Sequence, residues 1–85
     1  MAADISCLRF ESSAVLGRHP TGRQQIFAVV QGEGWVSGPD GMRHAIAAGQ
    51  AAFWDRGESH ESGTESGMTV LIVQAERLDA DTRPA

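Results

Sequence analysis

The sequence has a single cysteine, no long apolar run and no cluster of basic residues. With Cys7 alone, no internal disulfide can form, and we expect this residue to be a small apolar member of a strand. No segment approaches the ~18–20 apolar residues of a membrane span. The first residues, Met1-Ala-Ala-Asp-Ile-Ser6, lack the basic start and apolar stretch of a signal peptide. These absences predict a cytoplasmic protein that does not enter a membrane.

The net negative charge argues against nucleic acids and anionic membranes as partners. Net charge is −4, the pI is near 5.1, and the seven basic residues are scattered along the chain. Phosphate backbones and anionic lipid surfaces attract positively charged proteins. We therefore expect neither nucleic acid nor an acidic membrane surface to be a partner.

The chain has 85 residues and a mass of 9.1 kDa, and 41% of its residues are hydrophobic. These values predict one small globular domain. A chain this short buries only about 60–65% of the surface that it exposes when unfolded, so its stability margin is thin. Association with a second copy would bury additional apolar surface.

Strand-like segments dominate the chain, and no segment has a sustained helical period with caps at both ends. The turn-forming residues Gly38-Pro39-Asp40-Gly41 separate two of these segments and predict a hairpin. Short strands at regular spacing favour an all-β sandwich or barrel of about eight strands, spanning 1–78 as a single domain, with 79–85 as a flexible tail. The predicted strands are Ile5–Phe10, Gln25–Gln31, Gly34–Ser37, Met42–Ala47, Ala51–Trp54 and Met68–Gln74.

Two spaced motifs make the chain resemble the cupin family. The second cupin motif, G-x5-P-x-G-x2-H-x3-N, aligns with Gly49, Gly57 and His60, while Asp55 replaces the proline and Thr64 the asparagine. Together with the first motif, described below, the match spans roughly Ser13 to Thr64, which is most of the chain. It implies a jelly-roll β-sandwich or barrel in which His60 points into the interior.

The first cupin motif, G-x5-H-x-H-x3,4-E-x6-G, is less complete. Counting back from Gly32 with the three-residue spacer places Gln25 at the glutamate, Thr21 at the second histidine and His19 at the first. Ser13 falls at the opening glycine. The resemblance therefore implies a degenerate form of the family's metal site.

Metal chemistry follows from the resemblance only in part. Complete cupin sites present three histidines and one glutamate, a set suited to ions such as Zn, Mn, Fe or Ni. This chain retains His19 and His60, and Gln25 would be a weak third ligand at best. The pair could hold a divalent metal weakly, serve as polar groups of a metal-free pocket, or lie at the surface.

The same resemblance proposes a small-molecule pocket inside the barrel. By strand alternation, Phe27 follows Gln25 on one face, and Ser62 shares a face with His60. His44 lies at an edge facing solvent, lines the cavity as a hydrogen-bond donor, or adds a metal ligand. The complete set of predicted pocket residues is His19, Thr21, Gln25, Phe27, His44, Trp54, His60 and Ser62.

Three functions are compatible with these observations. The first is a binding module for a small organic molecule, with or without a weakly held metal. The second is a metal-dependent enzyme of the dioxygenase, isomerase or decarboxylase type, and the third is a non-catalytic scaffold. In each case we expect a homodimer that uses Ile5–Phe10 and the outward residues of Met68–Val73, because many cupins pair in this way.

Overall fold

The computed structural model describes residues 3–78, in which seven strands and no helix occur. None of these residues lies in a helix long and apolar enough to cross a membrane. The tail predicted at 79–85 lies outside the described residues. The strands are β1 (Ala3–Phe10), β2 (Val15–Pro20), β3 (Gln24–Ser37), β4 (Arg43–Ala47), β5 (Ala51–Trp54), β6 (Ser59–Gly63) and β7 (Met68–Ala75).

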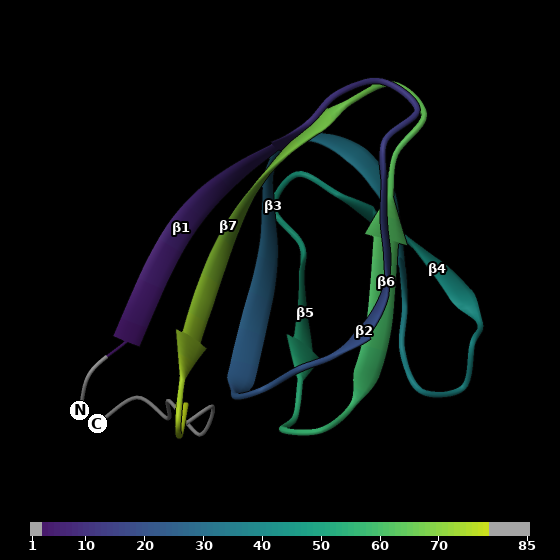
Figure 1. Ribbon diagram of the computed structural model, residues 1–85. Coiled ribbons are helices and arrows are strands. Elements are labelled where there is room, and N and C mark those ends of the chain that lie inside the picture. Colours follow the sequence, from purple (N-terminus) through teal and green to yellow (C-terminus); the bar gives the residue numbers. More distant parts are fainter. Residues whose placement is uncertain (1–2, 79–85) are drawn as a thin grey trace.

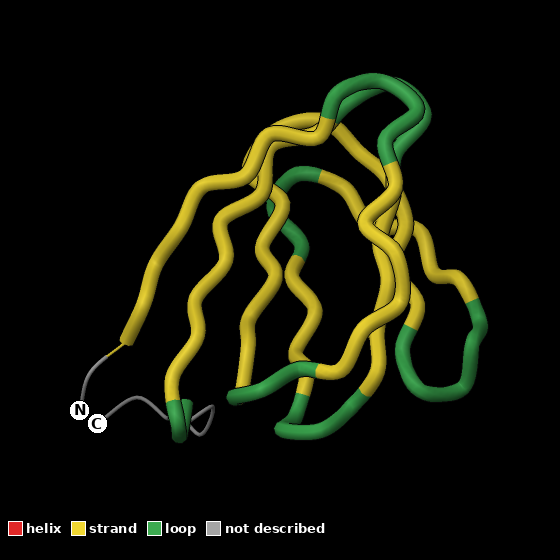
Figure 2. Tube along the Cα trace, viewed as in Figure 1, coloured by secondary structure: helices red, strands yellow, loops and turns green. Residues whose placement is uncertain are grey.

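The strands form two antiparallel sheets that share one long strand. Sheet A runs β1-β7-β3-β5 and uses the first half of β3, whereas sheet B runs β2-β6-β3-β4 and uses the second half. Figure 1 shows β1 and β7 on one side of the resulting open barrel and β2 and β6 on the other. The tube in Figure 2 shows the loops gathered at the two ends of the strands. The predicted all-β jelly-roll fold is thus confirmed.

One boundary predicted between two strands is absent from the structure. Gly32-Glu33-Gly34 was expected to separate two strands, but β3 runs through it and bends from sheet A into sheet B. At Gly32 the φ angle is +81°, and an added Cβ would collide with the carbonyl oxygen of Gly67. Glycine is required here because the bend brings two backbones together in a left-handed conformation.

Two strands were absent from the sequence-based set. β6 contains no large apolar residue, and β2 includes Gly17 and Pro20, so neither has the alternation typical of a strand. The two strands pair with each other, and β6 also pairs with β3, so their extended conformation comes from these neighbours. In contrast, the predicted hairpin turn is present, since the amide of Gly41 donates to the carbonyl of Gly38 at 3.0 Å.

The core fills the space between the sheets. Phe10 and Phe27 meet edge to face, with ring centroids 6.2 Å apart. Every other residue of β7 points inward, as expected for a strand with one buried face. The buried apolar residues of this core cluster are Phe10, Phe27, Val29, Val36, Ile46, Trp54, Met68, Val70 and Ile72.

Candidate functional site

Pairing of β2 with β6 brings two histidines together at one end of the barrel. His19 lies directly opposite His60 in the register, and their ring centroids are 4.5 Å apart. A register shift between Leu16 and His19 adjusts the pairing just before this point. The two motif histidines, forty-one positions apart in sequence, therefore face each other directly.

Burial keeps His60 neutral. Its side chain lies inside the barrel, and this desolvation, followed by the positive charges of His19 and Arg18, lowers the pKa of His60 to about 4, against a smaller opposing effect of Glu58. At neutral pH the ring therefore carries no charge. A neutral imidazole offers one N–H donor and one nitrogen lone pair, which suits either a polar ligand or a metal ion.

The other histidine is oriented by its own strand. Nδ1 of His19 lies 2.7 Å from the carbonyl oxygen of Gly17. Because a carbonyl only accepts, Nδ1 carries the hydrogen and donates it, which leaves Nε2 with the lone pair when the ring is neutral. Metal-binding histidines are commonly held by this kind of backbone hydrogen bond.

Three buried polar atoms near this end of the barrel have no hydrogen-bond partner among the described residues: Thr21 Oγ1, Trp54 Nε1 and His60 Nε2. The three residues are only 3%, 8% and 4% exposed. Trp54 and His60 are in contact, with ring centroids 5.2 Å apart. Since nearly all buried polar groups in proteins are hydrogen-bonded, these three atoms need partners that residues 3–78 do not supply.

The backbone fixes Thr21 beside this pair. Its amide donates to the carbonyl of Glu58 at 2.9 Å, and its own carbonyl accepts from Gly57 at 2.7 Å. These contacts continue the β2–β6 ladder by one residue, so Thr21 shares the inward face with His19. The hydroxyl is therefore presented to the interior at the position where complete cupin motifs have histidine.

Gln25 also faces the interior but already has a partner. It lies opposite Trp54 in the β3–β5 register, and its Nε2 donates to Gln74 Oε1 at 3.3 Å. Phe27, the next inward residue of the strand, belongs to the core. Ser62 is buried two residues beyond His60 and lies opposite Val36.

Of the three alternatives for His44, the structure agrees with the edge position and with the cavity lining, and it does not bring His44 to the histidine pair. It lies on β4 opposite Val36, two strands away from β6, and its side chain is exposed. Within residues 3–78, no group of three or more His, Cys, Asp or Glu side chains is placed to hold a metal ion. The reason is topological, because β4 lies at the opposite edge of sheet B from β2 and β3 separates it from β6.

His44 instead lines a cavity of about 330 Å³ at the seam between β4 and β5. Trp54 forms part of the same cavity and also contacts His60, so its indole lies between the cavity and the histidine pair. The cavity has two polar groups on an otherwise apolar lining, a composition common in small-molecule pockets. The lining residues are Val36, His44, Ala45, Ile46, Gln50, Ala51, Ala52 and Trp54.

The turn that leads into β6 is held by side chains in place of the usual proline. Asp55 Oδ1 accepts from Gln24 Nε2 at 3.0 Å and from the amide of Arg56 at 2.8 Å, and both bonds lower the pKa of Asp55. The amide of Asp55 in turn donates to Glu58 Oε1 at 2.6 Å. Glu58, an acidic residue close to His60 in sequence, is therefore occupied with the turn.

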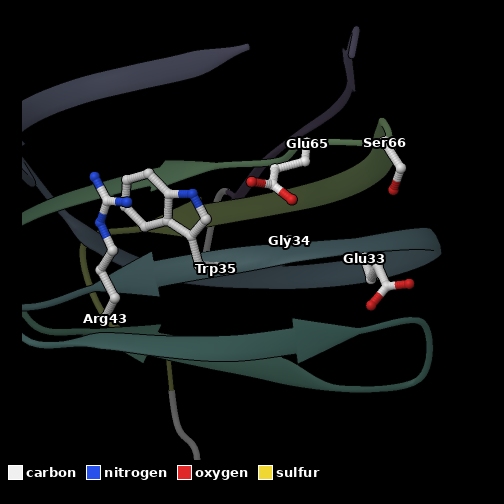
Figure 3. A pocket seen from close by; sticks show the side chains of 6 residues that line it. All are labelled: Glu33, Gly34, Trp35, Arg43, Glu65 and Ser66. Carbon is white, nitrogen blue, oxygen red and sulfur yellow. The ribbon is translucent and has the colours of Figure 1, made fainter. Parts of the chain in front are cut away.

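A second cavity, of about 440 Å³, lies on the outside of sheet B, where sequence reasoning predicted no site (Figure 3). The Arg43 guanidinium stacks 3.7 Å from the centre of the Trp35 ring. Trp35 packs over Gly63, where an added Cβ would approach the ring to 2.6 Å. Both neighbours hold the indole in place, and no motif in the sequence signals this arrangement. The lining residues are Glu33, Gly34, Trp35, Arg43, Glu65 and Ser66.

Comparisons with known proteins support the fold. No protein-family profile matches the sequence, and no curated protein matches it. KdgF from Halomonas sp. is 26% identical over 91% of this chain and 71% of its own, with a TM-score of 0.79. A predicted oxalate decarboxylase from Thermotoga maritima is also 26% identical, over 81% of this chain and 62% of its own, with a TM-score of 0.74.

A third neighbour relates the fold to a named superfamily. An RmlC-like cupin with a double-stranded β-helix fold from Methanocaldococcus jannaschii has a TM-score of 0.79, covers 86% of this chain and 69% of its own, and is 12% identical. Likeness at this identity concerns the fold alone. Together with the two motifs and the shared strand β3, it assigns the architecture. The chain therefore has the fold of the cupin proteins.

Proposed function

We propose that this protein binds a small organic molecule inside the barrel, at the end formed by β2, β5 and β6. The observation that carries the proposal is the trio of buried, unpartnered polar atoms on Thr21, Trp54 and His60. Leaving such groups unpaired costs about 1–3 kcal/mol each, so a ligand that pairs them recovers that free energy on binding. Trp54 Nε1 can only donate, so the ligand carries at least one hydrogen-bond acceptor.

The ligand would enter from the cavity at the β4–β5 seam. Trp54 lines this cavity and contacts His60, so its indole would have to move for a ligand in the cavity to reach the buried atoms of Thr21 and His60. The cavity volume of about 330 Å³ is at the lower end of the ordinary range for such pockets, roughly 300–1,000 Å³, so the ligand is small. Val36, Ile46 and Ala52 would contact its apolar part.

The test uses the two indole N–H resonances of ¹⁵N-labelled protein while small sugars, hydroxy acids and amides are added in turn. A binding compound should shift the Trp54 indole resonance and leave that of Trp35 in place. Trp54→Phe, which keeps a ring but loses the N–H, should weaken binding at least tenfold, whereas Trp35→Phe should not. A screen in which no compound moves the Trp54 resonance, or in which compounds move only that of Trp35, contradicts the proposal.

Thr21→Val separates a binding role from a structural one. Valine has nearly the shape of threonine without the unpartnered hydroxyl, so the substitution should leave stability unchanged or raise it by about 1 kcal/mol. Binding of the same compound should weaken. Loss of stability in urea unfolding would show that the hydroxyl is a structural group.

A weakly held divalent metal is the second candidate, favoured by the orientation of His19. Its Nδ1–H bond to Gly17 leaves Nε2 with the lone pair, and Nε2 of His60 has no partner. Two imidazoles do not fit a tightly bound ion, because the carboxylate that offsets the ion's charge is missing. The pair would fit only an ion that keeps most of its water, and such an ion would polarise a bound ligand.

Gln25→Glu tests the metal candidate by restoring the carboxylate. Calorimetric titration with Zn²⁺ or Ni²⁺ should show weak binding by the native protein and at least tenfold tighter binding by the variant. Gln31→Glu adds the same charge at an exposed position of β3 and should not change the affinity. Equal affinities for the native protein and Gln25→Glu would show that the histidine pair is no metal centre.

A further inference from the structure

The cavity on the outside of sheet B combines charges of both signs with an aromatic side chain (Figure 3). Its aromatic residue is Trp35, and the residues opposite it on the two neighbouring strands are Ala45 and Gly63. Because neither neighbour has a large side chain, a hollow remains on this part of the sheet surface. Its volume of about 440 Å³ lies within the ordinary range for small-molecule pockets, roughly 300–1,000 Å³.

Arg43 forms the positive end of this cavity. Its guanidinium stacks 3.7 Å from the centre of the Trp35 ring, and it forms no ion pair within residues 3–78. Stacking covers one face of the guanidinium plane and leaves the N–H donors at its edge free, because they lie in that plane. A carboxylate is the group that such a planar fork binds best, through two parallel hydrogen bonds. The stack therefore holds a carboxylate-binding group in a fixed orientation.

Glu33 and Glu65 form the negative end. Figure 3 shows both carboxylates on the side of the indole away from Arg43, and neither forms an ion pair among the described residues. The bend of β3 and the turn between β6 and β7 are tied together here, since Thr64 Oγ1 donates to the carbonyl of Glu33 at 2.6 Å and accepts from the amide of Gly67 at 2.9 Å. The backbone on which the two glutamates stand is therefore fixed.

Opposite charges are thus held apart across the cavity instead of neutralising each other. Two carboxylates alone would attract any cation and would not select among them. The guanidinium at the other end adds selection, because it repels simple cations and binds carboxylates. The two ends together match a molecule that carries both ammonium and carboxylate groups.

We propose that this cavity binds a free amino acid, with its carboxylate on Arg43 and its ammonium group at Glu33 and Glu65. The lining has two negative charges and one positive charge, so a basic amino acid, with the opposite count, matches it best. The methylenes of such a ligand would lie against the Trp35 ring. This site shares no lining residue with the cavity at the β4–β5 seam, so it is independent of the function proposed above.

Titration of ¹⁵N-labelled protein with L-lysine tests the site through the indole N–H resonance of Trp35. This resonance should shift, while that of Trp54 stays in place. Norleucine lacks the side-chain ammonium of lysine and ε-aminocaproate lacks its α-ammonium, so each should bind about threefold more weakly. Cadaverine lacks the carboxylate, loses the two-pronged contact with Arg43, and should bind about tenfold more weakly. Lysine binding should also weaken as salt is raised, because exposed charges are screened.

Two variants assign the two ends of the ligand. Arg43→Gln should bind lysine and cadaverine equally, and Glu65→Gln should lose most of the preference for lysine over norleucine. Ratios of affinities are compared, so a general weakening from disturbed packing does not imitate either result. Arg56→Gln and Glu76→Gln remove the same charges from an exposed ion pair outside this cavity and should leave both preferences unchanged.

Four results would overturn the proposal. Cadaverine could move the Trp35 resonance at the same concentrations as lysine, which would make the cavity an acidic patch that attracts any amine. Lysine could leave this resonance in place up to about 50 mM, the concentration at which even weak binding is detected. Lysine could move only the Trp54 resonance, which would assign it to the barrel interior. Finally, the control variants could change the preferences as much as Arg43→Gln and Glu65→Gln do.

Discussion

At the scale of single residues, the interior end of the barrel combines neutral histidine with unsatisfied hydrogen bonds. His60 is buried, its pKa is lowered to about 4, and its Nε2 has no partner. Thr21 and Trp54 contribute one more unpartnered atom each. Such a cluster lowers stability, so its presence favours a role in binding over a role in packing.

The lowered pKa of His60 predicts that stability falls in acid. The unfolded chain protonates this histidine near pH 6.5, whereas the folded chain resists protonation down to about pH 4. In this window the unfolded state binds more protons, so stability rises with pH and is complete above about pH 7. Urea unfolding should show a loss on the order of 2 kcal/mol between pH 6.5 and 4 that is attributable to this group.

His60→Gln is the control for this pH dependence, because glutamine does not titrate. The variant should lose stability less steeply over the same interval, while carboxylates contribute equally to both proteins. Parallel pH profiles of the two proteins would contradict the assignment of a depressed pKa to His60.

Sequence reasoning reached some of these residues and not others. Motif spacing singled out His19 and His60, which the structure places with ring centroids 4.5 Å apart. The spacing gave no information on His44, because its distance from the pair depends on strand order across sheet B. Nor could it reveal that Gln25 is bonded to Gln74, since β7 lies far along the chain.

At the scale of elements, glycine positions were more informative than apolar patterns. The motif glycines Gly32 and Gly57 both adopt positive φ angles and mark a strand bend and a turn. β6, with the sequence SHESG, has no local signal of a strand, and its conformation comes from its neighbours β2 and β3. Turns depend on neighbouring residues and can therefore be predicted from the local sequence, whereas strand pairing depends on residues that are distant in the sequence.

The turn between β1 and β2 carries backbone strain at another position where the cupin motif has glycine. Ser13 stands where the cupin motif opens with glycine, and its φ angle is +66°. A left-handed conformation costs a non-glycine residue about 1–2 kcal/mol, and glycine's greater freedom when unfolded offsets part of this. We expect Ser13→Gly to stabilise the protein by about 0.5–1 kcal/mol in urea unfolding.

Ser12→Gly is the control for that substitution, because Ser12 is also exposed but does not have a positive φ angle. It should leave stability unchanged or reduce it. If Ser13→Gly destabilises the protein as much as Ser12→Gly does, the turn stores no strain at Ser13.

At the scale of the whole molecule, the chain has to fold with little core. Among residues 3–78, nine buried apolar residues form one cluster between the sheets, while the outward face of sheet A, with the exposed Ile5 and Phe53, remains outside it. Small domains bury a modest share of their surface, so covering this face would add stability that the core alone does not supply. Length and composition predicted that the domain would be only marginally stable alone. Which surface is apolar could not be predicted, because it depends on the register of four strands.

If a second copy covers this face, the melting temperature should depend on protein concentration. In a dimer, unfolding releases two chains, so each tenfold increase in concentration favours the folded state by about 1.4 kcal/mol per dimer. For a domain of this size the shift should be about 3–5 °C per tenfold change. Differential scanning calorimetry of the native protein at 5, 50 and 500 μM, each value about tenfold above the last, measures it. Phe53→Glu should melt lower and at the same temperature throughout, and a native protein with that behaviour would show that the apolar face is left uncovered in the folded state.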